Sequence, residues 1–292
     1  MKGVIVKGIA GFYFVKAEGA VYRCKARGIF RKNGVKPVTG DVAEIEVTSG
    51  GDAVIDSIDK RKNEFIRPQI SNVDCFIVVI SPIRPKPNFS VIDRILVMAE
   101  KNEADVIICI NKIDIAEKEK VKYIEDIYKT IYPVVSVSAR SGDGVGQLNS
   151  LMQNAKYALV GPSGAGKSTL LNALLPSANV ETGEISRKTL RGKHTTRHTE
   201  IFDMKPGVML FDTPGFTSFS VADIEPDELQ RLYPEMAELY GQCEYNGCIH
   251  MKETGCAVKD AVKTGGVHES RYGSYSEIYK EIIVKRKYLY RG

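Results

Sequence analysis

The pattern of hydrophobic and polar positions changes twice along the chain. In the first 65 residues, short apolar or alternating segments are separated by glycine-containing turns. These segments are 4–6, 12–15, 21–24, 42–47 and 53–55. Such segments predict β-strands. Five strands in so short a stretch are typical of a small closed β-barrel, either an oligonucleotide-binding (OB) fold or an SH3-like barrel.

The middle of the chain alternates between continuous apolar runs and stretches with helical periodicity. The apolar runs are 75–81, 104–110, 134–139, 156–160 and 208–211. The helical stretches are 90–101, 117–132, 147–154 and a segment that opens at 170. Apolar runs that alternate with helices predict an α/β domain with a buried parallel sheet.

After residue 225 the strand pattern ends, and 226–240 and 269–290 predict helices. We therefore expect a multidomain chain. Its parts would be a β-barrel at 1–65, an α/β domain at 66–225 and a helical domain at 226–292.

A phosphate-binding loop follows the apolar run 156–160. The sequence there fits G-x-x-x-x-G-K-[ST] at every fixed position, between a predicted strand and a predicted helix, as the motif requires. Backbone N–H groups and the helix dipole favour an anion in such a loop. Lys167 would reach the β- and γ-phosphates of a nucleotide, and Ser168 would bind Mg²⁺. The expected loop is Gly161, Pro162, Ser163, Gly164, Ala165, Gly166, Lys167, Ser168 and Thr169.

A guanine-reading motif precedes this loop. Asn111-Lys112-Ile113-Asp114 matches N-K-x-D at the end of a predicted parallel strand, where α/β proteins bind ligands. The Asp114 carboxylate can accept hydrogen bonds from the N1–H and the amino group of guanine, and adenine has neither donor there. Asn111 would bond the other edge of the base, and the Lys112 stem would cover its face. The turn Ser138-Ala139 would add a backbone N–H to guanine O6.

Asp212-Thr213-Pro214-Gly215 matches D-x-x-G after another predicted strand. Asp212 would hold Mg²⁺ through a water molecule, and the Gly215 N–H would bond the γ-phosphate. In the polar stretch 183–199, Thr196 is the preferred Mg²⁺ ligand and Thr195 the alternative.

Phe216 follows the D-x-x-G motif, where Ras-like GTPases keep a glutamine that orients the attacking water. A polar group must therefore come from elsewhere. His194 is the first candidate for a catalytic residue, and His198 is the second.

A Cys-x₄-Cys-x-His-x₅-Cys motif lies near the C-terminus. Its three thiolates and one imidazole make a closed tetrahedral set, which is typical of structural rather than catalytic zinc. The expected ligands are Cys243, Cys248, His250 and Cys256. Three free cysteines are the alternative.

The composition adds a mild basic charge and indicates no membrane segment. The 292 residues carry a net charge of +5 and contain no run of 18 apolar residues, so we expect a cytoplasmic protein. Six basic residues crowd together among aromatic residues in the first part: Arg23, Lys25, Arg27, Arg31, Lys32 and Lys36. This composition fits both an RNA-binding face and a solvated loop.

In ordinary GTPases the phosphate loop precedes the guanine-reading motifs, whereas here it follows them, so the chain is a circular permutation. In its barrel, permuted motif order and Cys/His-rich tail, the chain resembles the family of circularly permuted small ribosomal subunit biogenesis GTPases (RsgA, also called YjeQ). The resemblance implies a cytoplasmic, monomeric GTPase that binds the 30S subunit and its 16S rRNA. It implies hydrolysis of GTP to GDP stimulated by that subunit during late maturation, with one structural Zn²⁺ and with Mg²⁺. The family's His-Thr-Thr switch corresponds to residues 194–196.

Other interpretations are an RNA-binding protein whose nucleotide site is only structural or regulatory, without a ribosome-specific function, and an ATP-dependent kinase. Asp114 argues against the kinase.

Overall fold

The computed structural model describes residues 1–32, 34–48, 51–66, 68–175, 199–212, 220–221 and 223–289. Several residues to which the sequence gives a role lie outside this part of the chain. They are His194, Thr195, Thr196, His198, Gly215 and Phe216.

The N-terminal part is a closed β-barrel, as predicted. Its strands are β1 (Lys2–Ile9), β2 (Phe12–Ala17), β3 (Ala20–Ala26), β4 (Val42–Val47) and β5 (Ala53–Ile58). They pair in the order β1-β2-β3-β5-β4, and β4 closes the barrel by pairing with β1. Only β3 and β5 are parallel. This Greek-key order identifies an OB-like barrel rather than an SH3-like one. A short helix not predicted from the sequence, α1 (Gly28–Lys32), follows β3.

The central part is built on a mostly parallel sheet. Its strands are β8 (Cys75–Ile80), β9 (Asp105–Asn111), β10 (Val134–Val137), β11 (Lys156–Val160), β12 (Glu200–Lys205) and β13 (Val208–Asp212). Their order is β10-β9-β8-β11-β13-β12, and β12 alone is antiparallel to its neighbour within this group.

Helices cover both faces of this sheet. On one face, Phe76 and Val78 share an apolar cluster with α2 (Phe89–Lys101) and α3 (Lys118–Tyr128). On the other face, Ile77 and Val79 share a cluster with α4 (Val145–Leu151) and α5 (Lys167–Leu174). Successive side chains of β8 point to opposite faces and all are buried, which explains its continuous apolar run.

The barrel and the central sheet are continuous, because β1 also pairs with β12. Two ion pairs support this junction: Lys7–Glu200 and Lys16–Asp203, each at 2.6 Å. A small hairpin, β6 (Glu64–Ile66) and β7 (Gln69–Ser71), lies between the two parts in the sequence.

The C-terminal part is helical, but its first helix is not the one predicted. Instead of one helix over 226–240, the chain forms a 3₁₀ turn, η2 (Leu229–Leu232), and a short helix, α6 (Pro234–Ala237). Pro234 disfavours a helical conformation of the preceding residue, and Tyr233 is extended, with φ −116° and ψ 99°. Two further helices follow: α7 (Ala257–Thr264), which was not predicted, and α8 (Glu269–Leu289), which was.

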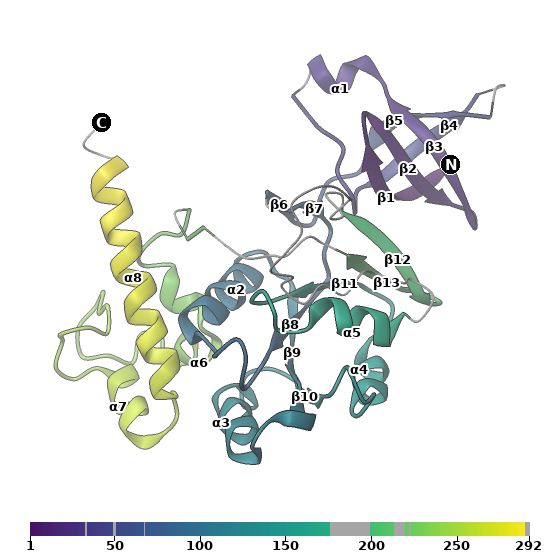
Figure 1. The fold of residues 1–292 in the computed structure, drawn as a ribbon. Coiled ribbons are helices and arrows are strands. Elements are labelled where there is room, and N and C mark those ends of the chain that lie inside the picture. Colours follow the sequence, from purple (N-terminus) through teal and green to yellow (C-terminus); the bar gives the residue numbers. More distant parts are fainter. Residues whose placement is uncertain are drawn as a thin grey trace, which may run out of the picture.

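Figure 1 shows α8 and the barrel on opposite sides of the central domain, with α8 beside α2. No helix in the described part of the chain is long and apolar enough to span a membrane.

Candidate nucleotide site and metal centre

The carboxyl ends of the parallel strands bring the predicted motifs to one edge of the sheet. Asn111 ends β9, Ser138 follows β10, Gly161 follows β11, and Asp212 ends β13. Crevices at this edge are the usual ligand sites of open α/β sheets.

Two glycines of the phosphate loop leave no room for a side chain. A Cβ on Gly161, which has φ +133°, would lie 2.3 Å from the carbonyl oxygen of Val79. A Cβ on Gly166, with φ +98°, would lie 2.3 Å from Nδ2 of Asn111. Both positions combine a left-handed conformation with close approach, so they require glycine.

Lys167 lies at the start of α5 with its amine turned back to the loop. Its Nζ donates to the carbonyl oxygens of Gly161, at 2.7 Å, and of Pro162, at 2.9 Å. Burial lowers the pKa of Lys167 to about 8, because desolvation disfavours the charged amine. The third donor position of this amine is available to a phosphate oxygen.

The buried side chain of Asn111 connects the N-K-x-D motif with the phosphate loop and with the Ser138-Ala139 turn. Its Nδ2 donates to the Ala165 carbonyl at 3.0 Å. Its Oδ1 accepts from the backbone N–H of Lys112 at 2.8 Å and of Ala139 at 3.0 Å. We expected Asn111 to bond guanine and a backbone N–H of the Ser138-Ala139 turn to face guanine O6. In the structure, the Asn111 side chain holds the phosphate loop against this turn, and the contacts with guanine remain predictions.

Lys112 and Asp114 complete this end of the site. The Nζ of Lys112 donates to the carbonyl oxygens of Arg84 and Gly164, both at 2.7 Å, and so fixes the phosphate loop from a second direction. Asp114 is exposed, and its Oδ1 accepts a hydrogen bond from the Ser138 hydroxyl at 2.8 Å. Ile113, between them, begins a 3₁₀ turn. The second carboxylate oxygen of Asp114 has no hydrogen bond described within the structure.

At the phosphate end, Ser168 is exposed and Asp212 is half-buried. Burial raises the pKa of Asp212, and the carboxylate of Glu200, its partner across the β12–β13 ladder, raises it further. A divalent cation would offset both effects. A carboxylate and a hydroxyl are the hard oxygen donors that Mg²⁺ prefers, so these residues fit the ion that accompanies GTP.

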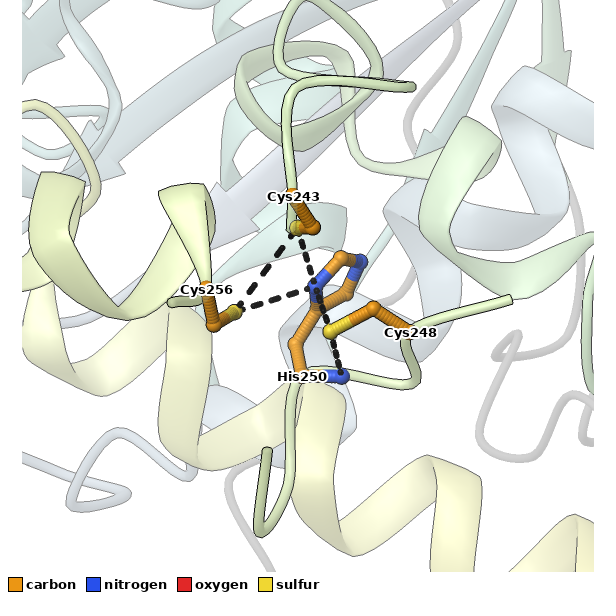
Figure 2. Close-up of side chains that lie close together, drawn as sticks. All are labelled: Cys243, Cys248, His250 and Cys256. Carbon is orange, nitrogen blue, oxygen red and sulfur yellow. Dashed lines mark hydrogen bonds between the residues drawn. The ribbon is translucent and has the colours of Figure 1, made fainter. Parts of the chain in front are cut away.

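The four predicted zinc ligands converge in the C-terminal part, where the imidazole of His250 points among the three sulfurs (Figure 2). Its Nδ1 lies 3.6 Å from Cys243 Sγ, 3.5 Å from Cys248 Sγ and 3.3 Å from Cys256 Sγ. Cys243 and Cys256 sulfurs are 4.0 Å apart. Zn–S and Zn–N bonds of about 2.3 and 2.0 Å place tetrahedral ligands about 3.5–3.8 Å apart. The donor set and its convergence therefore fit a structural zinc ion.

The zinc loop, residues 243–256, is held by contacts with α8 and η2 and by hydrogen bonds within the loop itself. From α8, the hydroxyl of Tyr272 donates to the His250 carbonyl at 2.7 Å, and that of Tyr275 to the Ile249 carbonyl at 3.1 Å. The Glu253 carboxylate accepts from backbone N–H groups of the loop. The other ring nitrogen of His250 lies 2.7 Å from Oε1 of Gln230.

Acidic side chains pair with two arginines of the basic cluster on the barrel. Arg23 pairs with Asp52 at 2.8 Å, and Arg27 pairs with Glu46 and Asp56. The Phe12 ring lies beneath both Arg23 and Lys25, each 5.1 Å from its centroid. Among the described side chains of the cluster, Lys25, Lys32 and Lys36 have no ion pair within 4 Å, and Lys36 donates to the neutral Gln69 Oε1 at 2.9 Å. A basic run in the sequence therefore overstates the free positive charge of this face.

Sequence analysis missed the contacts that join the motifs. The Arg84 carbonyl, Gln230 and the Lys7–Glu200 pair all depend on partners far away in the chain. No local pattern marks them.

Comparison with known proteins agrees with this geometry. Residues 58–222 match the family described as "RsgA GTPase", and residues 2–55 match "RsgA N-terminal domain". The chain is 42% identical over 290 residues to "Small ribosomal subunit biogenesis GTPase RsgA" of Alkaliphilus metalliredigens, covering 98% of this chain and 99% of that protein. The same name belongs to a protein of Agathobacter rectalis that is 39% identical, covering 99% of this chain and 100% of that protein.

Two crystal structures are similar along nearly the whole chain. YjeQ from Thermotoga maritima superposes with a TM-score of 0.83 at 35% identity, covering 97% of this chain and 98% of its own. YloQ, described as a circularly permuted GTPase, superposes with a TM-score of 0.81 at 34% identity, covering 97% and 95%.

Proposed function

The chain belongs to the RsgA family of circularly permuted GTPases, and we propose that it hydrolyses GTP to GDP and phosphate at the carboxyl edge of its central sheet, as a maturation factor of the small ribosomal subunit. One observation carries the nucleotide assignment. Asn111 and Lys112, from the N-K-x-D motif, hydrogen-bond to carbonyl groups of the phosphate loop more than 50 residues later. The permuted motifs thus form one site.

In this proposal each motif has a separate task. The loop 161–169 and the Lys167 amine bind the phosphates, and Asp114 reads guanine. Ser168, Asp212 and Thr196 would hold Mg²⁺, which neutralises phosphate charge when bound. The Gly215 N–H would bond the γ-phosphate. His194, outside the described residues like Thr196 and Gly215, would position the attacking water. Preorganised donors at developing charge are the main source of catalysis in such sites.

The finer assignments rest on family membership. We propose that the protein is a cytoplasmic monomer, that it contacts 16S rRNA within the 30S subunit, and that its domains are 1–65, 66–225 and 226–292. The exposed Lys25 near the Phe12 ring is compatible with RNA contact by the barrel.

The test is GTP turnover by the zinc-loaded full chain, alone and with purified 30S subunits. Stimulation of at least tenfold by 30S, and not by 50S, is the expected result. A turnover rate that 30S subunits do not change would instead indicate a regulatory switch with no ribosome-specific function. The absence of turnover under both conditions would refute the enzymatic assignment.

The His194→Ala variant should have a reduced GTP turnover rate and an unchanged GTP affinity.

The Asp114→Asn variant should bind xanthine nucleotides in preference to guanine nucleotides. An amide can donate to the O2 of xanthine, but it cannot accept both donors of guanine. Hydrogen bonds to a charged group contribute about 1.5–3 kcal/mol each, so GTP affinity should fall about 100-fold. Competition binding with GTP and xanthosine triphosphate measures the exchange. Asp143→Asn, an exposed carboxylate in the neighbouring turn, is the control and should bind GTP normally. Unchanged GTP affinity in Asp114→Asn would contradict the assigned role.

Nucleotide binding should take up a proton near pH 8. The pKa of Lys167 is lowered to about 8 by burial, and adjacent phosphates raise the pKa of an amine. At pH 8 about half of the protein molecules carry a neutral Lys167 amine, which must gain a proton when the nucleotide binds. The affinity for GTP should therefore decline as the pH rises above 8. Titration calorimetry in two buffers of different ionisation enthalpy measures this uptake. The Lys167→Ala variant should bind without it, and equal uptake in both proteins would assign the proton to another group.

A further inference from the structure

Gln230 contacts the predicted zinc centre without being a ligand. It belongs to η2, 20 residues before His250, and its Oε1 lies 2.7 Å from Nε2 of that histidine. The amide nitrogen of Gln230 faces the Asp227 carbonyl at 3.5 Å. This second contact orients the amide, so that its oxygen and not its nitrogen faces the imidazole.

The orientation of the imidazole fixes which nitrogen carries the proton. Nδ1 lies within 3.6 Å of all three sulfurs, so it is the nitrogen that a metal ion would bind. A ligating nitrogen carries no proton, and the proton of the neutral ring must then be on Nε2. That N–H is buried with its residue, which is 2% exposed, and it requires an acceptor. Gln230 Oε1 is the acceptor in place.

We propose that Gln230 is the positioning residue of the zinc centre, which holds His250 in the tautomer and orientation that bind the metal. This assignment goes beyond the proposed GTPase function and does not depend on it. Acceptors that bond the free N–H of a metal-bound histidine raise the basicity of the ligand and restrict ring rotation.

The same contact joins the metal centre to the central domain. Near the start of the segment that contains Gln230, the Lys101 amine of α2 bonds the Asp223 carbonyl and pairs with Glu228 at 3.2 Å. Leu229, next to Gln230, packs in one apolar cluster with Val97 of α2 and with Cys248. Residues 223–230 are therefore held between α2 and the zinc ligand His250. Within the part of the chain that the structure describes, Gln230 is the one side chain outside residues 243–256 that hydrogen-bonds the His250 ring.

The test compares zinc affinity among three variants of the full chain by competition with a chromophoric chelator. Gln230→Leu removes the acceptor at similar volume and should weaken zinc binding about 10–100-fold. Gln230→Glu keeps an acceptor and should bind within about threefold of the wild type, since carboxylates also fill this role. Gln242→Leu is the matched control, because Gln242 neighbours Cys243 but its amide bonds only the Glu238 carbonyl among described contacts.

A spectroscopic readout separates positioning from folding. In the zinc-loaded protein, ¹⁵N–¹H spectra should show the His250 Nε2–H as a slowly exchanging proton, and Gln230→Leu should make it exchange faster while the GTP affinity stays normal. Wild-type zinc affinity in Gln230→Leu would overturn the proposal. So would an equal loss in Gln230→Glu or in Gln242→Leu, because either outcome would assign the effect to packing rather than to the acceptor.

Discussion

A Lys167→Ala variant is expected to lose GTP hydrolysis almost completely, by a factor of about 100 or more in kcat/KM. The amine is already held beside the phosphate loop by the carbonyl oxygens of Gly161 and Pro162. Its remaining donor is the group that would meet the β- and γ-phosphates, and a charge-assisted hydrogen bond of this kind contributes about 1.5–3 kcal/mol. Because negative charge builds up on the oxygen that bridges the β- and γ-phosphates as its bond to the γ-phosphorus breaks, part of the loss should appear in kcat.

The measurement is GTP turnover with and without 30S subunits, with nucleotide affinity determined in parallel. Lys156→Ala is the matched control. Lys156 is also a partly buried lysine whose pKa burial lowers, but it begins strand β11 whereas the phosphate loop follows the end of that strand. The control should retain its turnover. A Lys167→Ala protein with full 30S-stimulated hydrolysis would show that the loop is not the catalytic phosphate site.

Local patterns predicted the parts of this protein whose physics is local. The phosphate-loop, N-K-x-D and zinc motifs each lie within about a dozen residues. The apolar runs of the sheet reflect burial on both faces of each strand. The type of barrel could not be predicted from the sequence, because an OB fold and an SH3-like barrel share the same pattern of strands. The parallel β3–β5 pair decides between them.

Long-range contacts and backbone details were not predictable in this way. The bonds of Asn111 to Ala165 and Ala139 were not predicted, because they exist only after the fold brings three strands together. The prediction of one helix over 226–240 was wrong because Pro234 interrupts it. The apolar stripe on which that prediction rested does mark buried positions, since Leu229, Leu232 and Met236 are all buried. Apolar spacing therefore identified the buried face without identifying the element.

The contact between α8 and α2 illustrates the same limit. Arg271 is fully buried and bonds Asp93 Oδ1 at 2.7 Å and Glu235 Oε1 at 2.7 Å, although 178 residues separate it from Asp93. Its guanidinium also lies 4.5 Å from the centroid of the Tyr233 ring. The Tyr128 hydroxyl donates to the same Asp93 oxygen at 3.0 Å. Any movement of the C-terminal part that keeps these contacts must carry α2 with it.

Replacing Arg271 by methionine should therefore destabilise the protein by about 3–5 kcal/mol, because two buried carboxylates lose their shared cation. Urea unfolding of the zinc-loaded chain measures the change. Lys263→Met is the control: it breaks the ion pair between Lys263 and Asp260, whose side chains are 73% and 62% exposed, and should leave the free energy of unfolding nearly unchanged. Adding Asp93→Asn and Glu235→Gln to Arg271→Met should recover much of the loss, since the buried charges are then removed together.

The pH dependence separates this electrostatic cause from a simple packing defect. Burial raises the pKa of Asp93, and Arg271 is the main group that opposes this shift. Without Arg271, the Asp93 pKa in the folded state lies further above its unfolded value of about 3.9. A group whose folded pKa is raised contributes most stability below the unfolded pKa and loses it as the pH rises. The free energy of unfolding of Arg271→Met, relative to the wild type, should therefore fall from pH 4 to pH 7. A constant difference over this range would assign the loss to packing against Tyr233 instead of to charge.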